Sequence, residues 1–444
     1  MRSVNRIDRY RYYEYTSKLQ RYSITTGFGT LNAMSLNVDS MRRIDRLAGV
    51  PLCALATALL EIWWWLRPIR PLPVRRILFI ELSEMGSTIL ADPAMRKARA
   101  QLNAELYFVI FTQNAESLDL TGTISRANVF RIRNTSLWDL ALDTLKFLLW
   151  TRRNQIDTVV DLELFSRFTA LLTGFSGANR RVGFYRFHNE GLYRGEMLTH
   201  RVAYNPHIHI AKNFIALIDA LLSDTPTIPY SKTLISDDEL TIALPPPRVT
   251  EREALLMRIK LLVPNLDLAR FRIVLINPNA SELLPLRRWM PERFTELIRR
   301  VLAAYDDVIV LITGAPSERP DAEKMAADCR SDRCVSFAGQ SALSDLPLLY
   351  ALAVAMVTND SGPAHFAAAA GLPTIVLFGP ETPNLYQPLG NSKAIYAGIA
   401  CSPCVSAHNH RKSACNDNVC MRAISVEQVF QALTAVLGTQ TRAR

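Results

Sequence analysis

The stretch from Val357 to His365, Val-Thr-Asn-Asp-Ser-Gly-Pro-Ala-His, runs from a short apolar segment into a polar turn and then into an alanine-rich run. This order predicts a strand, a turn and the start of a helix. The free N–H groups and the positive dipole end of such a helix favour a phosphate. Asp360 and Ser361 can cap the helix, and Gly362 lets a ligand approach the backbone. The turn therefore predicts a phosphate site of the kind that a sugar nucleotide would occupy.

Strand-like runs alternate with helical stretches on both sides of that turn, which is typical of parallel sheets covered by helices. A first series of β-rich runs lies between Arg75 and Tyr185, and a second lies between Arg272 and Pro380. A proline-rich stretch between residues 223 and 249 separates the two series. The sequence therefore predicts two α/β domains, over residues 75–245 and 250–436. We expect them to face each other across a cleft at the carboxyl ends of their strands.

Residues 1–74 form an extension that is basic and partly apolar. Up to residue 76 the chain carries 13 Lys and Arg against 5 Asp and Glu, which leaves only +2 of the net +10 for everything after it. The segment 50–66 (VPLCALATALLEIWWWL) is apolar except for Thr57 and Glu61. It is shorter than the ~20 residues of a spanning helix, and Glu61 would be costly at the bilayer centre. We expect it to lie in the membrane interface; packing on the protein's own surface and a true span are the alternatives.

The distribution of charge and the cysteine content limit the cellular location and the kinds of partner that we expect. Because the basic excess is confined to the extension, the globular part shows no nucleic-acid face. The seven cysteines form no regular disulfide framework, so we expect reduced thiols in a cytosolic setting. No cleavable secretory signal is evident, because the apolar run begins late. The sequence predicts a cytoplasmic protein at the inner face of the membrane, without a nucleic-acid partner.

Polar residues gather at the strand ends of both predicted domains, where ligands bind in such sheets. After the first strand of the first domain come Glu84, Gly86 and Ser87. Glu84 is the candidate general base, and an ordinary turn with a solvated Glu is the alternative. The glycine permits close approach of an acceptor. This loop is therefore predicted to form the acceptor side of the cleft.

The second domain carries the candidates for binding a nucleotide diphosphate. Guanidinium groups present paired donors to phosphate oxygens, and a carboxylate suits ribose hydroxyls. The alternatives are that the arginines solvate a loop and that the histidine packs within its helix. The candidates are Asn279, Arg287, Arg288, Thr313, Glu318, Asn359, Asp360, Ser361, Gly362 and His365.

Four cysteines, Cys401, Cys404, Cys415 and Cys420, lie close together near the end of the chain. One CxxC pair followed by wider spacings is compatible with a zinc site or a redox pair. Structural thiols are the alternative that we favour. We therefore predict neither a bound metal nor a cofactor.

Several stretches together resemble glycosyltransferase family 9, the lipopolysaccharide heptosyltransferases. They are FIELSEMGS from Phe79, INPNASELLPLRRWMPERF from Ile276, VTNDSGPAHFAAAAGLPTIVLFGPETP from Val357, and the Cys-rich segment. The resemblance implies a GT-B fold, in which two Rossmann-like domains hold the acceptor on the N-terminal side and the donor on the C-terminal side. It also implies metal-independent, inverting transfer of a heptose-like sugar. ADP-heptose is the expected donor, and a lipopolysaccharide or other envelope glycan the expected acceptor.

The resemblance also assigns roles to individual residues. Asp360, Ser361, Gly362 and His365 match the donor-phosphate turn of the family. Arg287 matches the basic residue that contacts the diphosphate, and it would stabilise the leaving group. Glu318 matches the carboxylate that binds the ribose.

One position departs from the family pattern. The family has Met-Gly-Asp in the acceptor-side loop, with the Asp as proposed general base, whereas this chain has Met85, Gly86 and Ser87. A serine does not act as a base without help. Either Glu84 has taken the role, or the acceptor or the activity has changed.

Other classes of function were weighed against transfer. No GxGxxG follows the first strand of either domain, and neither a Walker motif nor HExxH is present, which disfavours a nicotinamide-dependent oxidoreductase. A sugar-nucleotide epimerase of GT-B fold would need no acceptor. A catalytically inactive homologue would bind the donor without turnover. We expect a glycosyltransferase that acts on a lipid-linked or envelope glycan acceptor.

Overall fold

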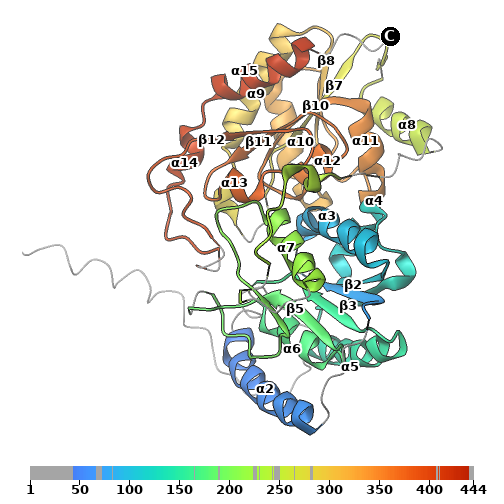
Figure 1. The fold of residues 1–444 in the computed structure, drawn as a ribbon. Helices are drawn as coiled ribbons and strands as arrows, with labels where there is room; N and C mark the ends of the chain where they lie inside the picture. The colour runs from blue at the N-terminus through green and yellow to red at the C-terminus, as the bar shows by residue number, and fades with distance from the viewer. Residues whose placement is uncertain are drawn as a thin grey trace, which may run out of the picture.

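The structure, a computed structural model, describes residues 44–439 apart from short gaps at 67–72, 83, 165, 189–190, 224–227, 230, 243, 245–250, 265, 281–283, 407–408 and 410. Two domains, each built on a parallel sheet, are stacked one on the other (Figure 1). The predictions made for residues 1–43 lie outside the described residues.

The first sheet has six strands within the described residues, in the order β3-β2-β1-β4-β5-β6. All neighbouring strands are parallel. The strands are β1 Arg76–Ile80, β2 Glu105–Phe111, β3 Val129–Ile132, β4 Thr158–Asp161, β5 Arg180–Phe184 and β6 His200–Val202. The helices of this domain are α3 Met85–Leu102, α4 Ser117–Thr121, α5 Leu137–Arg153, α6 Arg167–Phe175 and α7 Ile210–Leu222. This is the Rossmann strand order, whose topological switch point lies between β1 and β4.

The second sheet repeats that order as β12-β11-β10-β7-β8-β9, again with six parallel strands in the described part of the chain. Its strands are β7 Arg272–Asn277, β8 Val308–Ile312, β9 Cys334–Ser336, β10 Ala353–Asn359, β11 Thr374–Phe378 and β12 Ser392–Tyr396. Its helices are α8 Arg252–Leu262, α9 Pro291–Ala304, α10 Arg319–Cys329, α11 Leu346–Leu352, α12 Gly362–Ala369, α13 Pro383–Tyr386, α14 Val419–Ala423 and α15 Val426–Thr439. The switch point here lies between β7 and β10. The predicted GT-B architecture is confirmed.

The apolar pattern of the sequence explains these elements. The strand β8 (VIVLI) is apolar throughout and buried throughout, because helices cover both faces of a parallel sheet. The helix α9 starts with Pro291, whose fixed φ suits the first helical position. Its residues Phe294, Leu297, Ile298 and Val301 recur at helical spacing and are buried, while its charged residues face outward.

An apolar cluster joins the two domains. Ile89 of α3 and Leu120 of α4 pack in one core cluster with Phe366 and Ala367 of α12. The helices α3 and α12 therefore lie against each other across the domain boundary. The packing brings the beginning of α3 and the beginning of α12 to the same place.

The helix α2 (Gly49–Leu66) covers most of the segment predicted to lie at a membrane interface. It lies at the end of the first domain that is remote from the second domain (Figure 1). Gly49, Cys53 and Ala56 are its buried residues, and it packs on α6. By length and composition alone, α2 is the helix among the described residues that is long and apolar enough to cross a membrane.

Candidate active site

The carboxyl end of β10 forms one wall of the candidate site. Asn359, which ends this strand, is fully buried. Its Oδ1 accepts a hydrogen bond from the N–H of Trp289 (3.0 Å), and its Nδ2 donates to the carbonyl of Pro278 (2.7 Å). Asn359 stays a predicted donor-binding residue, and in this structure its amide ties the segment after β7 to the end of β10. It thereby shapes the crevice at the switch point.

The helix α12 begins at this crevice. Ser361 occupies its N-cap position, yet among the described residues no side chain caps the helix, and the Ser361 hydroxyl donates to the carbonyl of Asn359 (3.2 Å). The prediction that Asp360 and Ser361 cap the helix is therefore wrong, because Asp360 is buried and paired elsewhere. The first N–H groups of a helix have no intrahelical partner, so an uncapped start presents them to a ligand.

Five side chains of alternating charge run from the start of α12 across to the first domain. We call Asp360, Arg287, Glu381, Arg411 and Glu84 the charge ladder. Arg287 places its Nε 3.4 Å from Asp360 Oδ2 and its Nη2 2.7 Å from Glu381 Oε2. Arg411 places its Nε 3.4 Å from Glu381 Oε1 and also pairs with Glu84. The predicted base and the predicted diphosphate contact are thus joined through Glu381, to which sequence reasoning assigned no role, and Arg411, which it missed.

Burial governs the electrostatics of the charge ladder. It raises the pKa of Glu381 to about 7, against the opposing attraction of Arg287. It likewise raises the pKa of Asp360, again opposed by Arg287. Burial would lower the pKa of Arg287, but the facing carboxylates of Asp360 and Glu381 outweigh it and raise that pKa. Arg287 therefore stays charged, and Glu381 is the member of this cluster poised to gain or lose a proton near neutral pH.

The acceptor-side loop meets the donor turn directly. Glu84 occupies the N-cap position of α3, and Gly86 lies in the first turn of that helix. A Cβ on Gly86 would lie 3.0 Å from Cδ2 of His365, so a larger residue there would press on the histidine. Ser87 follows in the same turn and is half-buried. The structure thus brings together two loops that the sequence assigned to opposite sides of the cleft.

His365 is buried at this contact and is not free to act as a surface acid or base. Burial lowers its pKa to about 3, and the positive charges of His209 and Arg287 add to that effect. Its Nδ1 has no hydrogen-bond partner among the described residues. The alternative in which His365 packs within the protein therefore describes its environment in this structure.

The remaining donor-side candidates lie at the ends of β7 and β8. A Cβ on Gly314 would lie 2.7 Å from Nδ2 of Asn279 and 2.8 Å from Oε2 of Glu318, so these two side chains converge. Thr313 accepts a hydrogen bond from Asn277 (3.2 Å) and is buried beside them. Arg288 turns away and donates to the carbonyl of Ala280 (2.9 Å).

The Cys-rich segment lies over the turn that follows β11. The N–H groups of Cys404 and Val405 both donate to the carbonyl of Pro380 at 3.0 Å. A Cβ on Gly379 would lie 3.1 Å from Sγ of Cys420, so the packing there is tight. All seven cysteines are free thiols, and the described residues contain no group of three or more His, Cys, Asp or Glu placed to hold a metal ion. What the segment visibly contributes to the site is Arg411.

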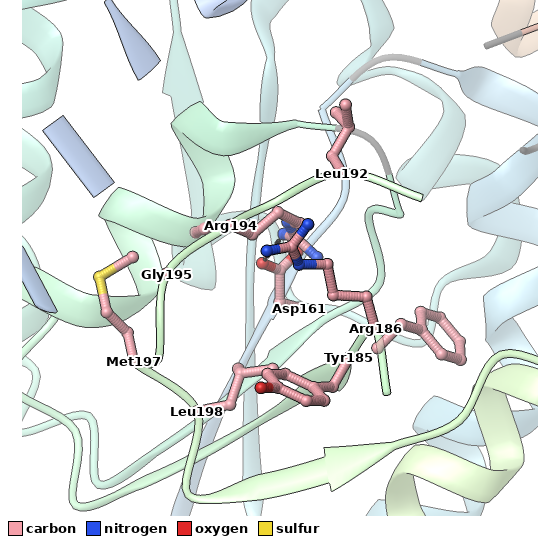
Figure 2. Close-up of a pocket in the computed structure, with 10 residues that line it drawn as sticks. Asp161, Tyr185, Arg186, Leu192, Arg194, Gly195, Met197 and Leu198 are labelled. Atoms are coloured by element: carbon pink, nitrogen blue, oxygen red, sulfur yellow. Dashed lines mark hydrogen bonds and ion pairs between the residues drawn. The ribbon is translucent and has the colours of Figure 1, made fainter. Parts of the chain in front are cut away.

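A second group of polar residues lies beyond the carboxyl ends of β4 and β5. Asp161 ends β4, is fully buried and pairs with Arg194, and burial raises its pKa to about 6 against the attraction of that arginine. Figure 2 shows both side chains in a pocket with Tyr185 and Arg186. Sequence reasoning missed this pocket, because Asp161 lies inside the β-rich run predicted from Asp157 to Leu164, whereas in the structure it ends β4. It lies on the side of the cleft predicted for the acceptor.

The buried His365 predicts a specific loss of stability in acid. The unfolded chain binds a proton there near pH 6.5, whereas the folded chain does so only near pH 3. Between these values the unfolded state binds more protons, so the free energy of unfolding falls as the pH drops below 6.5; about 2 kcal/mol should be lost by pH 5. His365→Gln should lack this loss in urea unfolding at pH 7 and pH 5. The exposed His207→Gln should keep it; equal behaviour of the two variants would contradict the assignment.

The sequence of this chain matches a known protein family. The sequence profile described as glycosyltransferase family 9 (heptosyltransferase) matches residues 149–414, which is more than half of the chain. Lipopolysaccharide heptosyltransferase 2 of Salmonella typhimurium is 29% identical over 118 residues, which cover 26% of this chain and 33% of that protein. The Escherichia coli K12 protein of the same name is 26% identical over 162 residues, covering 35% and 44%. The matched segments thus span less than half of these relatives.

Solved structures agree on the fold. E. coli ADP-heptose LPS heptosyltransferase II superposes with a TM-score of 0.60 at 19% identity, covering 82% of this chain and 98% of that one. A family 9 glycosyltransferase from Veillonella parvula gives a TM-score of 0.62 at 17% identity, covering 84% and 99%. Identities this low show a common fold and no more. The family profile, which matches residues 149–414, shows that the chain belongs to glycosyltransferase family 9.

Proposed function

We propose that this protein is an inverting, metal-independent glycosyltransferase. It moves a heptose-like sugar from a nucleotide diphosphate sugar, with ADP-heptose as the expected donor, to a lipopolysaccharide or other envelope glycan. The observation that carries the proposal is the charge ladder at the uncapped start of α12, between two Rossmann-like domains. The names of the relatives support the choice of sugar and acceptor.

The donor diphosphate is proposed to lie at the start of α12. Backbone N–H groups near Ser361 and Gly362 and the dipole of the helix stabilise negative charge there, and Arg287 lies alongside. As the glycosidic C–O bond breaks, the electron pair passes to the diphosphate. Arg287 and the helix terminus stabilise the charge that then develops on the leaving group. Asn279, Thr313 and Glu318, at the neighbouring strand ends, are placed for the nucleoside.

The acceptor hydroxyl attacks the anomeric carbon from the side of the first domain. Its oxygen forms the new glycosidic bond, and its proton passes to the Glu84 carboxylate, the proposed general base. In this structure that carboxylate is paired with Arg411. A bound diphosphate would compete for the guanidinium of Arg411 and so release Glu84. Donor binding would thereby prepare the base.

We further propose a cytoplasmic location with peripheral attachment to the inner face of the membrane. The support is α2, whose side chains are apolar and exposed over most of its surface. Attachment there would let the enzyme reach an acceptor that is anchored in lipid.

The donor site is tested by a substitution that the fold tolerates. A Cβ on Gly362 would meet no atom of the protein closer than 4.0 Å, yet it would project at the proposed phosphate site. Gly362→Ala should therefore weaken ADP binding roughly tenfold or more, at unchanged thermal stability. Calorimetry with a panel of nucleotide diphosphates and sugar nucleotides measures this. Gly438→Ala, in open space on α15, is the matched control and should bind ADP like the wild type. Equal ADP binding by the two variants would contradict a phosphate site at the start of α12.

The base is tested by Glu84→Gln. The substitution keeps the shape but removes the proton acceptor, so turnover should fall on the order of 10²–10⁴-fold. Donor binding should be retained or strengthened, because the substitution frees Arg411 for the diphosphate. Glu253→Gln, on the exposed face of α8, is the control. Unchanged turnover in Glu84→Gln would remove Glu84 from the mechanism. Wild-type protein that binds the donor but never transfers would indicate an inactive homologue, and conversion of the sugar nucleotide alone would indicate an epimerase.

Donor binding should also take up protons. The pKa of Glu381 already lies at about 7, and a diphosphate placed beside it would raise that pKa further. Calorimetric ADP titrations near pH 7 in two buffers of different ionisation enthalpy should therefore give different heats. In Glu381→Gln this difference should disappear. Buffer-independent heats in the wild type would contradict the charge arrangement proposed here.

A further inference from the structure

The helix α5 shows an unexpected surface to solvent. Its buried residues Asp143, Phe147 and Thr151 face the first sheet, so its other side should be polar. That side instead carries Trp138, 85% exposed, together with Leu142, Leu145 and Leu149, each about half exposed. These residues recur at helical spacing and form one continuous apolar stripe. Contiguous exposed apolar surface of this kind marks an interaction site.

The helix α2 lies beside α5 and adds to the stripe. Its exposed side chains include Leu52, Leu55, Leu59 and Ile62. Between the two helices runs a groove floored by α6 and lined by Leu52, Leu55, Ala56, Leu59, Thr144, Leu148, Phe168, Leu171, Leu172 and Phe175. Thr144 is the one polar residue of that lining. We call the exposed sides of α2 and α5 with this groove the two-helix face.

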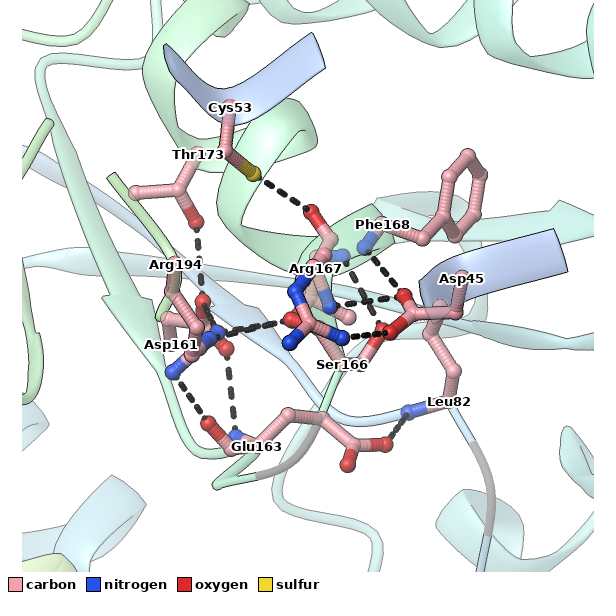
Figure 3. Close-up of polar contacts among 11 residues, drawn as sticks. Asp45, Cys53, Leu82, Asp161, Glu163, Ser166, Arg167, Phe168, Thr173 and Arg194 are labelled. Carbon is pink, nitrogen blue, oxygen red and sulfur yellow. Dashed lines mark hydrogen bonds and ion pairs between the residues drawn. The ribbon is translucent and has the colours of Figure 1, made fainter. Parts of the chain in front are cut away.

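The two-helix face is a fixed part of the first domain. Asp45, which precedes α2, pairs with Arg167 of α6 at 2.9 Å, and its carboxylate also accepts from the Arg167 and Phe168 N–H groups (Figure 3). Farther along, the Thr57 hydroxyl accepts from the N–H of Glu196 (3.0 Å). Arg181 lies 4.2 Å from the ring centre of Trp64, near the end of α2. These contacts hold α2 against the first domain at both of its ends and near its middle.

The chemistry of the two-helix face matches one occupant. Exposed cations border it, namely Lys146, Arg152 and Arg153 on α5 and Arg46 before α2. Trp65, 80% exposed, and Trp138 supply the amphipathic rings typical of membrane interfaces. Apolar surface framed by Trp and basic residues complements an anionic phospholipid bilayer.

We propose that α2 and α5 together dock this protein on an anionic bilayer, with lipid acyl chains entering the groove between them. The inference rests on the proposed function only where it supposes a lipid-linked acceptor; the docking itself requires no sugar transfer. The proposed attachment thus involves the two-helix face and not α2 alone. Contact through both helices would define the orientation of the first domain relative to the membrane.

Docking through the two-helix face would also bring the acceptor side of the cleft to the lipid. A Cβ on Gly195 would lie 2.7 Å from Oγ1 of Thr57 and 3.0 Å from the carbonyl of Cys53, so the segment around Gly195 packs directly on α2. The same segment supplies Arg194 and Met197 to the pocket beyond β4 and β5. An acceptor anchored in the leaflet would therefore find this pocket next to the helix that touches its headgroups.

Vesicle flotation of the full chain tests the proposal. The α5 variant Leu142→Gln, Leu145→Gln, Leu149→Gln changes only exposed side chains, so its fold should persist. The matched control is Met257→Gln, Leu261→Gln, which removes equally exposed apolar side chains from α8 of the second domain. Vesicles contain either phosphatidylglycerol with phosphatidylethanolamine, or phosphatidylcholine alone. Thermal unfolding and ADP binding of each variant, measured without vesicles, report on the fold and on the donor site.

The wild type and the α8 control should float with the anionic vesicles and bind the neutral ones more weakly. The α5 variant should lose roughly tenfold or more of its partition coefficient. An α5 variant that binds anionic vesicles like the wild type would overturn the proposal. So would a wild-type dimer in light scattering that the α5 substitutions dissociate, because a second copy would then cover the face. Neither outcome depends on glycosyl transfer, so a failure of the proposed function would be recognised separately.

Discussion

One buried arginine organises the cleft of this protein. Arg287 lies between the buried carboxylates of Asp360 and Glu381, and an unpaired charge at such a position would be strongly destabilising. The pairing determines where the turn before α12 and the turn after β11 stand relative to each other. It also leaves the start of α12 uncapped, because Asp360 faces the arginine instead of the helix. The uncapped start of α12 therefore follows from a charge arrangement and not from the helix alone.

The same arrangement links the two domains. Arg411 extends the charge ladder to Glu84, Gly86 meets His365, and His209 of α7 contacts the carbonyl of Gln387 at 2.8 Å. These polar contacts lie beside an apolar cluster shared by α3 and α12. A substrate that inserts charge between Arg411 and Glu84 would alter the polar contacts and leave the apolar ones in place. The contact between the domains thus has an apolar side and a charged side.

The proposed site of chemistry and the proposed membrane face are separated along the first domain. Its helices α3 and α4 lie toward the second domain, whereas α2 and α5 lie at the remote end (Figure 1). The segment from Arg194 to Met197 connects the two regions, because it lines the pocket beyond β4 and packs on α2. Such a layout suits the proposed acceptor with a lipid anchor and a polar head. Under the proposed docking, the anchor would stay in the leaflet while the hydroxyl reaches the site.

The sequence by itself determined the two Rossmann-like domains and the strand ends near which the candidate site residues, among them Arg287, Asp360 and Gly362, lie. Those features depend on local apolar periodicity and on short motifs, which can be recognised from a few consecutive residues. Only the tertiary structure decided that the amide of Asn359 connects the segment after β7 to the end of β10. It also decided that His365 is buried against Gly86 and that Arg411 pairs with Glu84. Only the tertiary structure showed that the apolar stripe on α5 is exposed to solvent. A Leu-rich helix has the same sequence pattern whether its apolar side is packed against the protein or faces solvent. Contacts between residues far apart in the chain and the burial they create are set by packing, which local patterns do not encode.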